Sequence, residues 1–454
     1  MTVDSPYADL IEKMSPVCAV AVDSYEVAAV LEADGITDVA AQERYSARDV
    51  FDLADRLFRL RPRVRQADRP APDPWQATPV THVLRGVLFA LPALAYLAVA
   101  DRIAGPRPTA LLVVSVLLSW TVGQGLAHLG YARLGRADQR AAAVLGGAAL
   151  IVGLPAVTVV AALGIALGVS LTVTLIAAGQ VAYVLAATVA LVLGREWWLL
   201  AALVPGVGAG IGRLVAGPDA GPSGLLAAAA ALSVAAAIVV AGWQHLRGVR
   251  PQLPSRVDVA AASPNAAFGA VVGALLIFTP VARALDATPD PRIGVGTALA
   301  MVLPLSVSMG VAEWLLFRYR SAARRAMAEA RTLQAFGRRA STALSGVTTA
   351  YLAVLVTIFL AGIGLTALLT GVLPAAWPVA AAVLTGVALF LALLLMSFHL
   401  RGPAVLACLA ALAASLLLAP FAPPETIQAV TAAGLLIGLY AYAHVTLRRA
   451  QLHL

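Results

Sequence analysis

The segment Thr109–Gly130, TALLVVSVLLSWTVGQGLAHLG, runs for 22 residues without an aspartate, glutamate, lysine or arginine. A transmembrane helix needs about 20 consecutive, mostly apolar residues. Further apolar segments, separated by glycine, proline and arginine, follow one another from Val83 to the end of the chain. Their hydrophobicity is continuous and does not alternate as it does in a transmembrane strand. The pattern therefore predicts an all-α polytopic membrane protein.

The composition excludes several other classes of protein. Of the 454 residues, 60% are hydrophobic and 12% are charged, whereas soluble domains carry about 25% charged residues. This excludes a soluble enzyme and a disordered chain, and two cysteines exclude a disulfide scaffold. The net charge of +8 is explained below by membrane topology, so we expect no nucleic acid partner.

We count twelve predicted spans in the chain, and the ninth is long enough to tilt or to extend beyond the bilayer. The spans cover residues 83–100, 109–130, 142–163, 168–193, 197–216, 224–242, 266–285, 293–316, 343–371, 377–398, 403–420 and 427–446.

The basic residues are distributed unevenly between the two sides that these spans define. With the N-terminus on the inner side, 27 of the 32 Lys and Arg residues fall on that side. Cytoplasmic connections are enriched in Lys and Arg. We therefore expect a multi-pass protein of the cytoplasmic (inner or plasma) membrane with both termini in the cytoplasm.

Spans one and two align with spans seven and eight at an offset of 187 to 190 residues. Pro92 then falls on Pro280, and Ser119 falls on Ser306. Because six spans separate the copies, they have the same orientation, which predicts two parallel six-helix lobes with a pathway between them. Proline inside a helix removes a backbone hydrogen bond and bends the helix. Paired interrupted helices mark a transport site.

The first 60 residues differ from the rest, because 12 of the 24 acidic residues lie between Asp4 and Asp55. Asp23 and Thr37 stand at the starts of two helical segments as N-caps, and Asp34-Gly35 forms a turn. Ser46, with Asp49 three residues later, suggests a capping box before an amphipathic helix. We expect a small helical cytoplasmic domain that binds a cytoplasmic protein partner.

The predicted organisation has six parts. They are the helical domain 1–60, an Arg/Pro-rich linker 61–82, lobe 1 at 83–242, a cytoplasmic linker 243–265, lobe 2 at 266–446 and a cytoplasmic tail 447–454.

Polar residues inside the spans are the candidates for a transport path, because a charge at mid-bilayer costs about 2.5–3.5 kcal/mol. Gln124 and Gln180 would bond a neighbouring helix or a polar substrate. Glu313 would either pair with nearby Arg318 and Arg320 or serve as a proton or cation site. The candidates are Pro92, Gln124, Gln180, Pro280, Ser306 and Glu313.

The sequence offers no catalytic constellation, and we expect no enzyme, no cofactor and no metal. The six histidines, among them His82 and His128, are scattered mostly near helix ends without ligand spacing, which suggests interfacial positions. Arg85, at the inner end of span one, would anchor that helix at the interface or hold an anionic headgroup.

The connection between spans eight and nine predicts a basic cytoplasmic surface on a helical extension. Each Arg near an anionic lipid surface contributes about 1 kcal/mol of attraction, so membrane lipids are the expected partner; a phosphorylated or lipid-linked substrate or a protein is the alternative. The residues are Arg318, Arg320, Arg324, Arg325, Arg331, Arg338 and Arg339.

The segment Gly123–Asp138, GQGLAHLGYARLGRAD, resembles the second-helix region of the multidrug/oligosaccharidyl-lipid/polysaccharide (MOP) exporter superfamily. The resemblance implies two six-helix lobes around a central cavity, and bent first and seventh helices. It also implies alternating access, as in proteins that flip polyprenyl-linked sugars or export drugs. On this basis we expect a flippase or exporter of lipid-linked saccharide or polysaccharide.

Two other functions remain open from the sequence. Gly130–Arg136 resembles the loop-two motif of the major facilitator superfamily, although Ala132 stands where that motif has Asp. The low charge of the spans is also compatible with a non-catalytic membrane scaffold of an envelope polysaccharide assembly, held to a partner by the N-terminal domain.

Overall fold

The structure, a computed structural model, describes residues 6–21, 23–60, 79–97, 105–216, 223–284, 295–330, 332–370 and 376–453. The chain divides into two compact units, residues 1–74 and 75–454. Most of the predicted linker 61–82 lies outside the described residues.

The described residues of the N-terminal unit form four helices: α1 (Pro6–Val20), α2 (Ser24–Ala33), α3 (Asp38–Tyr45) and α4 (Val50–Leu60). The Asp23 side chain accepts hydrogen bonds from the backbone N–H groups of Tyr25 and Glu26, at 3.0 and 3.1 Å. Thr37 accepts from the Ala40 N–H at 3.4 Å. Both predicted N-caps are confirmed.

Apolar side chains from all four helices form the core of this unit. Val27, Leu31 and Leu53 are fully buried there. Helix α1 was not expected from the sequence, yet it contributes Leu10 and Met14 to the same core. Each helix therefore buries apolar side chains against the other three, and the buried residue that α3 contributes is Ala41.

The start of α4 differs from the predicted capping box. Ser46 adopts a left-handed conformation, with φ 52°, at the end of α3. Asp49 instead accepts the Asp52 N–H at 2.7 Å. The Asp52 carboxylate in turn accepts from the Arg48 N–H at 2.9 Å and from the Arg56 guanidinium at 2.5 Å. These bonds lower the pKa of Asp52 below its ordinary value, chiefly through the Arg48 N–H and then Arg56.

The lowered pKa of Asp52 predicts a pH dependence for this unit. A carboxyl group with a depressed folded-state pKa stabilises the fold above its unfolded pKa, and that contribution is lost as the pH falls through the folded value. We expect Asp52→Asn to be less stable than wild type at neutral pH and to lose less stability on acidification below about pH 4. Thermal unfolding followed by circular dichroism on residues 1–60 measures both. An equal slope in the two proteins would refute the role of Asp52.

In the described part of the second unit, twelve α-helices correspond to the twelve predicted spans, and a short 3-10 helix, η2 (Ala450–His453), follows them. They are α5 (Pro79–Leu97), α6 (Pro106–Leu134), α7 (Ala141–Ala166), α8 (Leu171–Val192), α9 (Glu196–Ala216), α10 (Ser223–Leu246), α11 (Arg256–Ala284), α12 (Val295–Glu329), α13 (Leu333–Thr370), α14 (Ala376–Ser397), α15 (Arg401–Leu418) and α16 (Pro424–Thr446).

Among the described residues, nine of these helices are long and apolar enough to cross a membrane, and Val80–Pro92 of α5 forms a shorter apolar stretch. The protein is a multi-pass membrane protein. Three boundaries differ from the predicted spans by ten residues or more. Helix α11 begins ten residues earlier, within the expected linker 243–265, and α13 also begins ten residues earlier. Helix α12 ends at Glu329, within the predicted helical extension beyond span eight.

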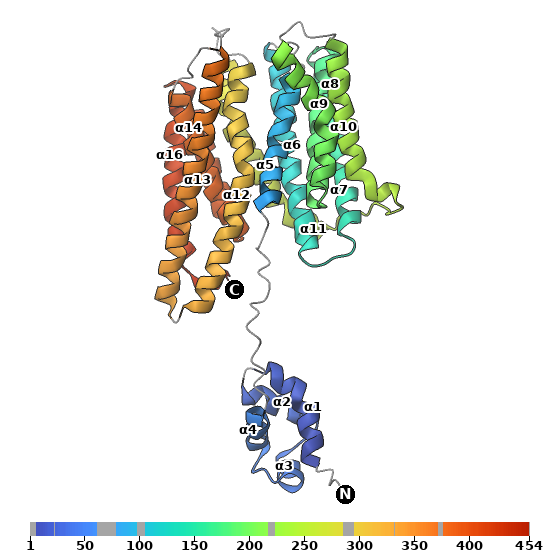
Figure 1. The fold of residues 1–454 in the computed structure, drawn as a ribbon, viewed down its shortest axis with the longest axis vertical. Helices are drawn as coiled ribbons and strands as arrows, with labels where there is room; N and C mark the ends of the chain where they lie inside the picture. Colours follow the sequence, from blue (N-terminus) through green and yellow to red (C-terminus); the bar gives the residue numbers. More distant parts are fainter. Residues whose placement is uncertain are drawn as a thin grey trace. The chain divides into compact units, whose positions relative to one another are not determined.

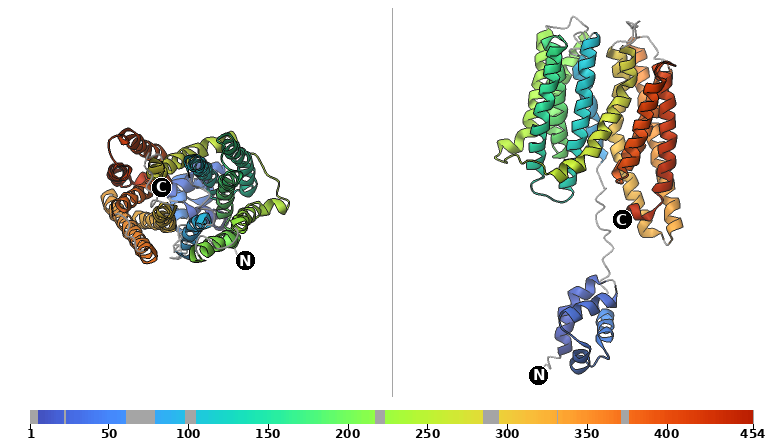
Figure 2. Two further views of the ribbon diagram at one scale, coloured as in Figure 1. Left: turned by 90° about the horizontal axis from the view of Figure 1, so that it is seen from above. Right: turned by 180° about the vertical axis from the view of Figure 1, so that it is seen from behind.

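The helices form two lobes, α5–α10 and α11–α16, and each has its own apolar core. One core extends from Leu88 to Ala241 and the other from Phe268 to Leu447. Figure 1 shows α13, α14 and α16 on one side of the unit and α7, α8 and α10 on the other, with α5 and α12 between them. Figure 2 shows the same two groups from behind.

The helix pairings of lobe 1 recur in lobe 2 six helices later. Helix α5 packs on α9 as α11 packs on α15, α6 on α8 as α12 on α14, and α8 on α10 as α14 on α16. The contacts between the lobes follow the same repeat. Helix α5 of lobe 1 packs on α12 of lobe 2, and their equivalents six helices away, α11 and α6, pack on each other. This recurrence confirms the predicted parallel repeat and defines two seams between the lobes, the α5–α12 seam and the α6–α11 seam.

Helices α12 and α13 are the longest in the unit, with 35 and 38 residues. At 1.5 Å per residue they span roughly 50–57 Å, against a hydrocarbon core of about 30 Å. Their shared hairpin reaches beyond the neighbouring helices at the end of the unit where α5 begins (Figure 1). We name this the proximal end, and the opposite one the distal end.

Candidate functional site: a buried ion cluster between the lobes

Four ionisable side chains meet at the proximal end of the α5–α12 seam. His82 and Arg85 lie on α5, one turn apart, and Glu196 is the first residue of α9. Glu313 comes from α12, on the other lobe. We name these four residues the Arg85 cluster.

Arg85 is the centre of this cluster and binds two carboxylates. Its Nε and Nη2 atoms donate to Glu196 Oε1, at 3.1 and 2.8 Å. Its Nη1 atom donates to Glu313 Oε1. The side chains of Arg85 and Glu196 are only 15% and 10% exposed. The Arg85–Glu313 bond therefore ties lobe 1 to lobe 2 at a site largely removed from water.

The backbones of α5 and α12 come unusually close beside this cluster. A Cβ atom added at Gly86 would lie 2.6 Å from the Val307 carbonyl oxygen, and one added at Gly310 would overlap the His82 carbonyl oxygen. Glycine therefore permits the close approach of two helix backbones, as small residues do at membrane helix interfaces. This approach brings Glu313 within reach of Arg85.

The cluster can separate along the lobe boundary without leaving Arg85 unpaired. Glu196 belongs to the same lobe as Arg85 and occupies two of its donors, so that pair would survive a parting of the lobes. Glu313 would lose Arg85, and His82 would lose its contact with Glu313. Removing the last partner of a buried charge has the largest cost in free energy. Because Arg85 keeps Glu196 as a partner, its bond to Glu313 can break and re-form at a lower cost.

The α6–α11 seam carries a second set of polar contacts at its proximal end. Arg133 of α6 binds Asp258 of α11 at 2.6 Å. Arg401, the first residue of α15, lies 3.4 Å from the His128 ring of α6 and donates to the Ala261 carbonyl at 3.2 Å. Arg133 also binds Asp138, in the connection that follows α6, so this arginine too is shared by two carboxylates. Both seams are thus fastened at the proximal end by an arginine that holds one carboxylate of its own lobe and one of the other lobe.

The structure separates the predicted path residues rather than gathering them in one site. Gln124 of α6 packs against Gly269 in the α6–α11 seam. Gln180 lies half-buried on α8, and Ser306 half-buried on α12. Glu313 does not use Arg318 or Arg320, as one prediction had it, because α5 supplies Arg85 and His82.

The two aligned prolines both lie inside their helices, but their environments differ. Pro92 of α5 is half-buried, whereas Pro280 of α11 is exposed. Prolines also occur within α7, α9 and α12, at Pro155, Pro205 and Pro304. An interior proline therefore does not single out α5 and α11 in this chain.

The arginines of the predicted basic surface that the structure describes are exposed, with one exception. Arg320 is half-buried and donates to the Ser397 carbonyl. Its guanidinium carbon lies 5.1 Å from the centre of the Phe398 ring. It joins α12 to α14 instead of facing solvent. Arg331 lies outside the described residues. The exposed members are Arg318, Arg324, Arg325, Arg338 and Arg339.

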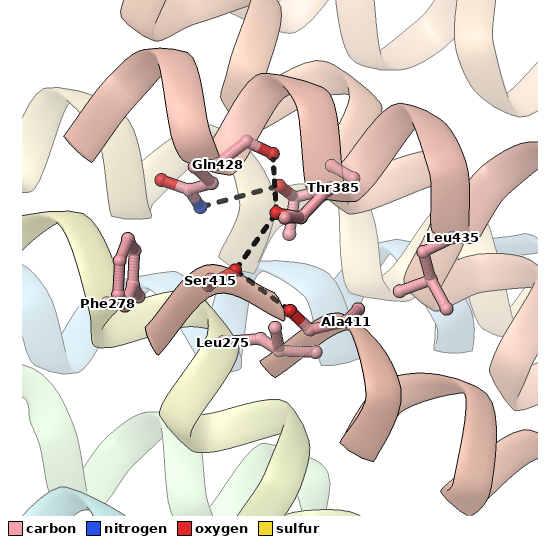
Figure 3. Close-up of a pocket in the computed structure, with 9 residues that line it drawn as sticks. Leu275, Phe278, Thr385, Ala411, Ser415, Gln428 and Leu435 are labelled. Carbon is pink, nitrogen blue, oxygen red and sulfur yellow. Dashed lines mark hydrogen bonds between the residues drawn. The ribbon is translucent and has the colours of Figure 1, made fainter. Parts of the chain in front are cut away.

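A smaller polar site lies inside lobe 2, between α11, α14, α15 and α16 (Figure 3). Ser415 donates to Thr431 at 3.0 Å, and the Gln428 amide donates to Thr385 at 3.4 Å. Thr279 of α11 also bonds Gln428. Because these groups satisfy one another within one lobe, they join its helices, as interhelical hydrogen bonds do in membranes.

Two members of the Arg85 cluster, Glu196 and His82, were not predicted from the sequence to be functional residues. Glu196 lies 111 residues from its partner and looks like an ordinary acidic residue in the first turn of a helix. His82 was expected at an interface, yet it is 2% exposed. The available signal was Glu313 itself, a carboxylate inside an apolar span, which requires a buried cation as partner.

Comparison with known proteins supports the fold through structure rather than sequence. No protein-family model matches the chain, and no curated protein matches its sequence. Solved structures do match. An outward-facing multidrug resistance MATE family transporter of the MOP superfamily is 14% identical with a TM-score of 0.52, covering 82% of this chain and 97% of that one.

Two further solved structures have similar scores. A MATE protein in complex with MaL6 has a TM-score of 0.53 and 14% identity, covering 82% of this chain and 97% of that one. A MOP superfamily transporter from Pyrococcus furiosus has a TM-score of 0.51 and 13% identity, covering 83% and 98%. These similarities concern the fold: the chain has the fold of the MOP superfamily transporters.

Proposed function

We propose that this protein is a membrane transporter that works by alternating access, and that its cargo is a lipid-linked saccharide or polysaccharide. The observation that carries the proposal is the Arg85–Glu313 bond, which joins the two lobes at one end and leaves Arg85 paired with Glu196 when it breaks. The shared fold of transporters supports the same conclusion. Parting at the proximal end would open the pathway between the lobes on that side.

The proximal end faces the cytoplasm in this proposal, within the inner or plasma membrane. The excess of Lys and Arg on the predicted inner side supports this orientation. The five exposed arginines of α12 and α13 then lie where anionic membrane lipids and the phosphate of a lipid-linked cargo would be. Charge attraction at this surface would concentrate such a cargo beside the α5–α12 seam.

Reconstitution in proteoliposomes tests the proposal. The probe is a polyprenyl-diphosphate-linked saccharide that carries a fluorophore, whose signal from the outer leaflet is removed by a membrane-impermeant reductant. We expect the protein to expose inner-leaflet probe to the reductant, whereas a fluorescent phosphatidylglycerol stays protected. Protection of the saccharide probe equal to that in empty liposomes would refute the assigned cargo.

The N-terminal unit has a separate role in this proposal, which is to bind a cytoplasmic protein. Tyr25 and Phe51 are 70% and 52% exposed, and their ring centres lie 6.1 Å apart. Such an exposed aromatic pair on an acidic domain is suited to protein contact. Deletion of residues 1–60 is expected to leave probe movement in proteoliposomes intact. If the full-length chain binds a partner but moves no probe, the protein is a scaffold and not a transporter.

A further inference from the structure

A cavity of about 400 Å³ lies at the distal end of lobe 2, where α11 and α15 end and α16 begins. Among the residues that the structure describes, Phe278 and Arg283 line it from α11, Ala419 from the end of α15 and Ile427 from α16. Phe278 and Ile427 are buried. Ligand pockets in proteins have volumes of about 300–1,000 Å³, so this cavity is large enough to hold a ligand.

One ion pair gives this mostly apolar cavity its charge. The Nε and Nη2 atoms of Arg283 donate to the two carboxylate oxygens of Glu425, at 2.6 and 2.8 Å. Glu425 directly follows Pro424, which also lines the cavity. The side chains of Arg283 and Glu425 are 36% and 13% exposed. The pair therefore presents one positive and one negative charge side by side, which complements a ligand that itself carries both charges.

The ion pair lies at the depth of the lipid headgroups. Trp377, on the first turn of α14, is 52% exposed, and its indole N–H donates to Thr426 Oγ1 at 3.2 Å. Tryptophan is enriched at the interface between membrane and water. Thr426 directly follows Glu425 in the chain, so the ion pair lies in the headgroup layer of the leaflet at the distal end.

The residues beside the cavity face lipid tails. Leu417 and Phe421 are 74% and 80% exposed, and they precede and follow Ala419 by two residues. Large exposed apolar side chains on a membrane protein mark its contact with lipid. A ligand with apolar tails can therefore reach the cavity from within the bilayer, with its polar part at the ion pair.

We propose that this cavity binds one phospholipid of the distal leaflet whose headgroup carries a phosphate and a primary ammonium, as phosphatidylethanolamine does. The phosphate accepts hydrogen bonds from Arg283, and the ammonium donates to Glu425. A carboxylate has about four acceptor positions, so Glu425 can bind the ammonium and keep its two bonds from Arg283. A phosphatidylglycerol headgroup offers no ammonium, and a choline headgroup has no N–H group to donate. The site lies within lobe 2 and does not depend on the transport proposed above.

Native mass spectrometry of the full-length protein in mild detergent tests this proposal. Phosphatidylethanolamine, phosphatidylcholine and phosphatidylglycerol with identical acyl chains are added one at a time, and the affinity for the first bound lipid is measured. We expect phosphatidylethanolamine to bind about tenfold more tightly than the other two, as one charge-assisted hydrogen bond would cause. Glu425→Gln removes the partner of the ammonium and leaves the charge of Arg283 uncompensated. This variant is expected to bind phosphatidylglycerol best, whereas a merely structural ion pair would not set the headgroup preference.

A second variant tests the cavity and leaves the ion pair intact, so it decides the question even if Glu425→Gln does not fold. Ala422 lines the cavity, and Ala422→Leu is expected to fill it and to weaken the binding of phosphatidylethanolamine to the level of the other lipids. Ala413→Leu, at an exposed position earlier on α15, is the matched control and is expected to bind as wild type does. Equal affinity of wild type for the three lipids would overturn the proposal. Binding by Ala422→Leu that equals wild type would place the lipid elsewhere and would overturn it as well.

Discussion

Arg85→Gln is expected to open the α5–α12 seam and to stop cargo movement, because it leaves Glu196 and Glu313 buried without their cation. Removing one partner of a buried ion pair costs about 3–5 kcal/mol. The Glu313 side chain is 26% exposed, so we place the loss near the lower end, about 3 kcal/mol. At 1.4 kcal/mol per factor of ten, this would shift the ratio of closed to open seam by roughly a hundredfold.

The measurement combines stability with distance. Thermal unfolding in lipid nanodiscs reports the cost to the fold. The distance between spin labels at Arg136→Cys in lobe 1 and Arg338→Cys in lobe 2, two exposed positions at the proximal end, is measured by electron spin resonance and reports the seam. Arg283→Gln is the matched control, because Arg283 binds Glu425 through two hydrogen bonds, at 2.6 and 2.8 Å, within lobe 2. We expect that control to lose stability without changing the distance between the lobes.

Glu313→Gln separates the gating role of the cluster from its structural role. This change removes the bond between lobes but keeps the Arg85–Glu196 pair inside lobe 1. We expect the seam to open while the melting temperature changes less than in Arg85→Gln. The double variant Arg85→Gln with Glu313→Gln should be less unstable than the sum of the two single variants, because it leaves one orphan carboxylate instead of two. Strict additivity, with an unchanged distance in Glu313→Gln, would contradict a gate at this bond.

The helices of the membrane unit could be predicted because their signal is local. An apolar run such as that in α6 identifies a span without reference to any other part of the chain. The repeat was visible for a related reason, since Pro92 and Pro280 could be aligned without knowing which helices touch. The caps Asp23 and Thr37 act within three residues of themselves, and they too were predictable.

The Arg85 cluster could not be predicted because its partners are far apart in the sequence. Glu313 and Arg85 are separated by 228 residues, and the order of the chain does not say which of several arginines Glu313 meets. Arg318 was the nearer candidate, but it lies along its own helix over the Trp314 ring, 5.0 Å from the ring centre. The packing of α12 on α5 determines which arginine Glu313 contacts. That packing depends on small residues, and the sequence alone does not show which small residues lie at a helix contact.

Gly310→Ala is expected to push α5 and α12 apart. This substitution tests whether the packing of α12 on α5 depends on small residues. The new Cβ would overlap the His82 carbonyl oxygen and lie 2.8 Å from the Gly86 nitrogen. Both neighbours are backbone atoms, so no side chain can rotate away. Overpacking a close interface costs about 1–3 kcal/mol, and the displaced α12 would also carry Glu313 away from Arg85.

Two other glycines make the experiment specific to the seam. Gly434→Ala is the neutral control, because an added Cβ there meets nothing within 4 Å. Gly269→Ala introduces a steric clash in the α6–α11 seam instead, because the added Cβ would lie 2.5 Å from the Trp120 carbonyl oxygen. We expect both Gly310→Ala and Gly269→Ala to lengthen the distance between the labels and to reduce probe movement severalfold. A Gly310→Ala protein with the wild-type distance and activity would show that the two backbones do not need this approach for the lobes to close.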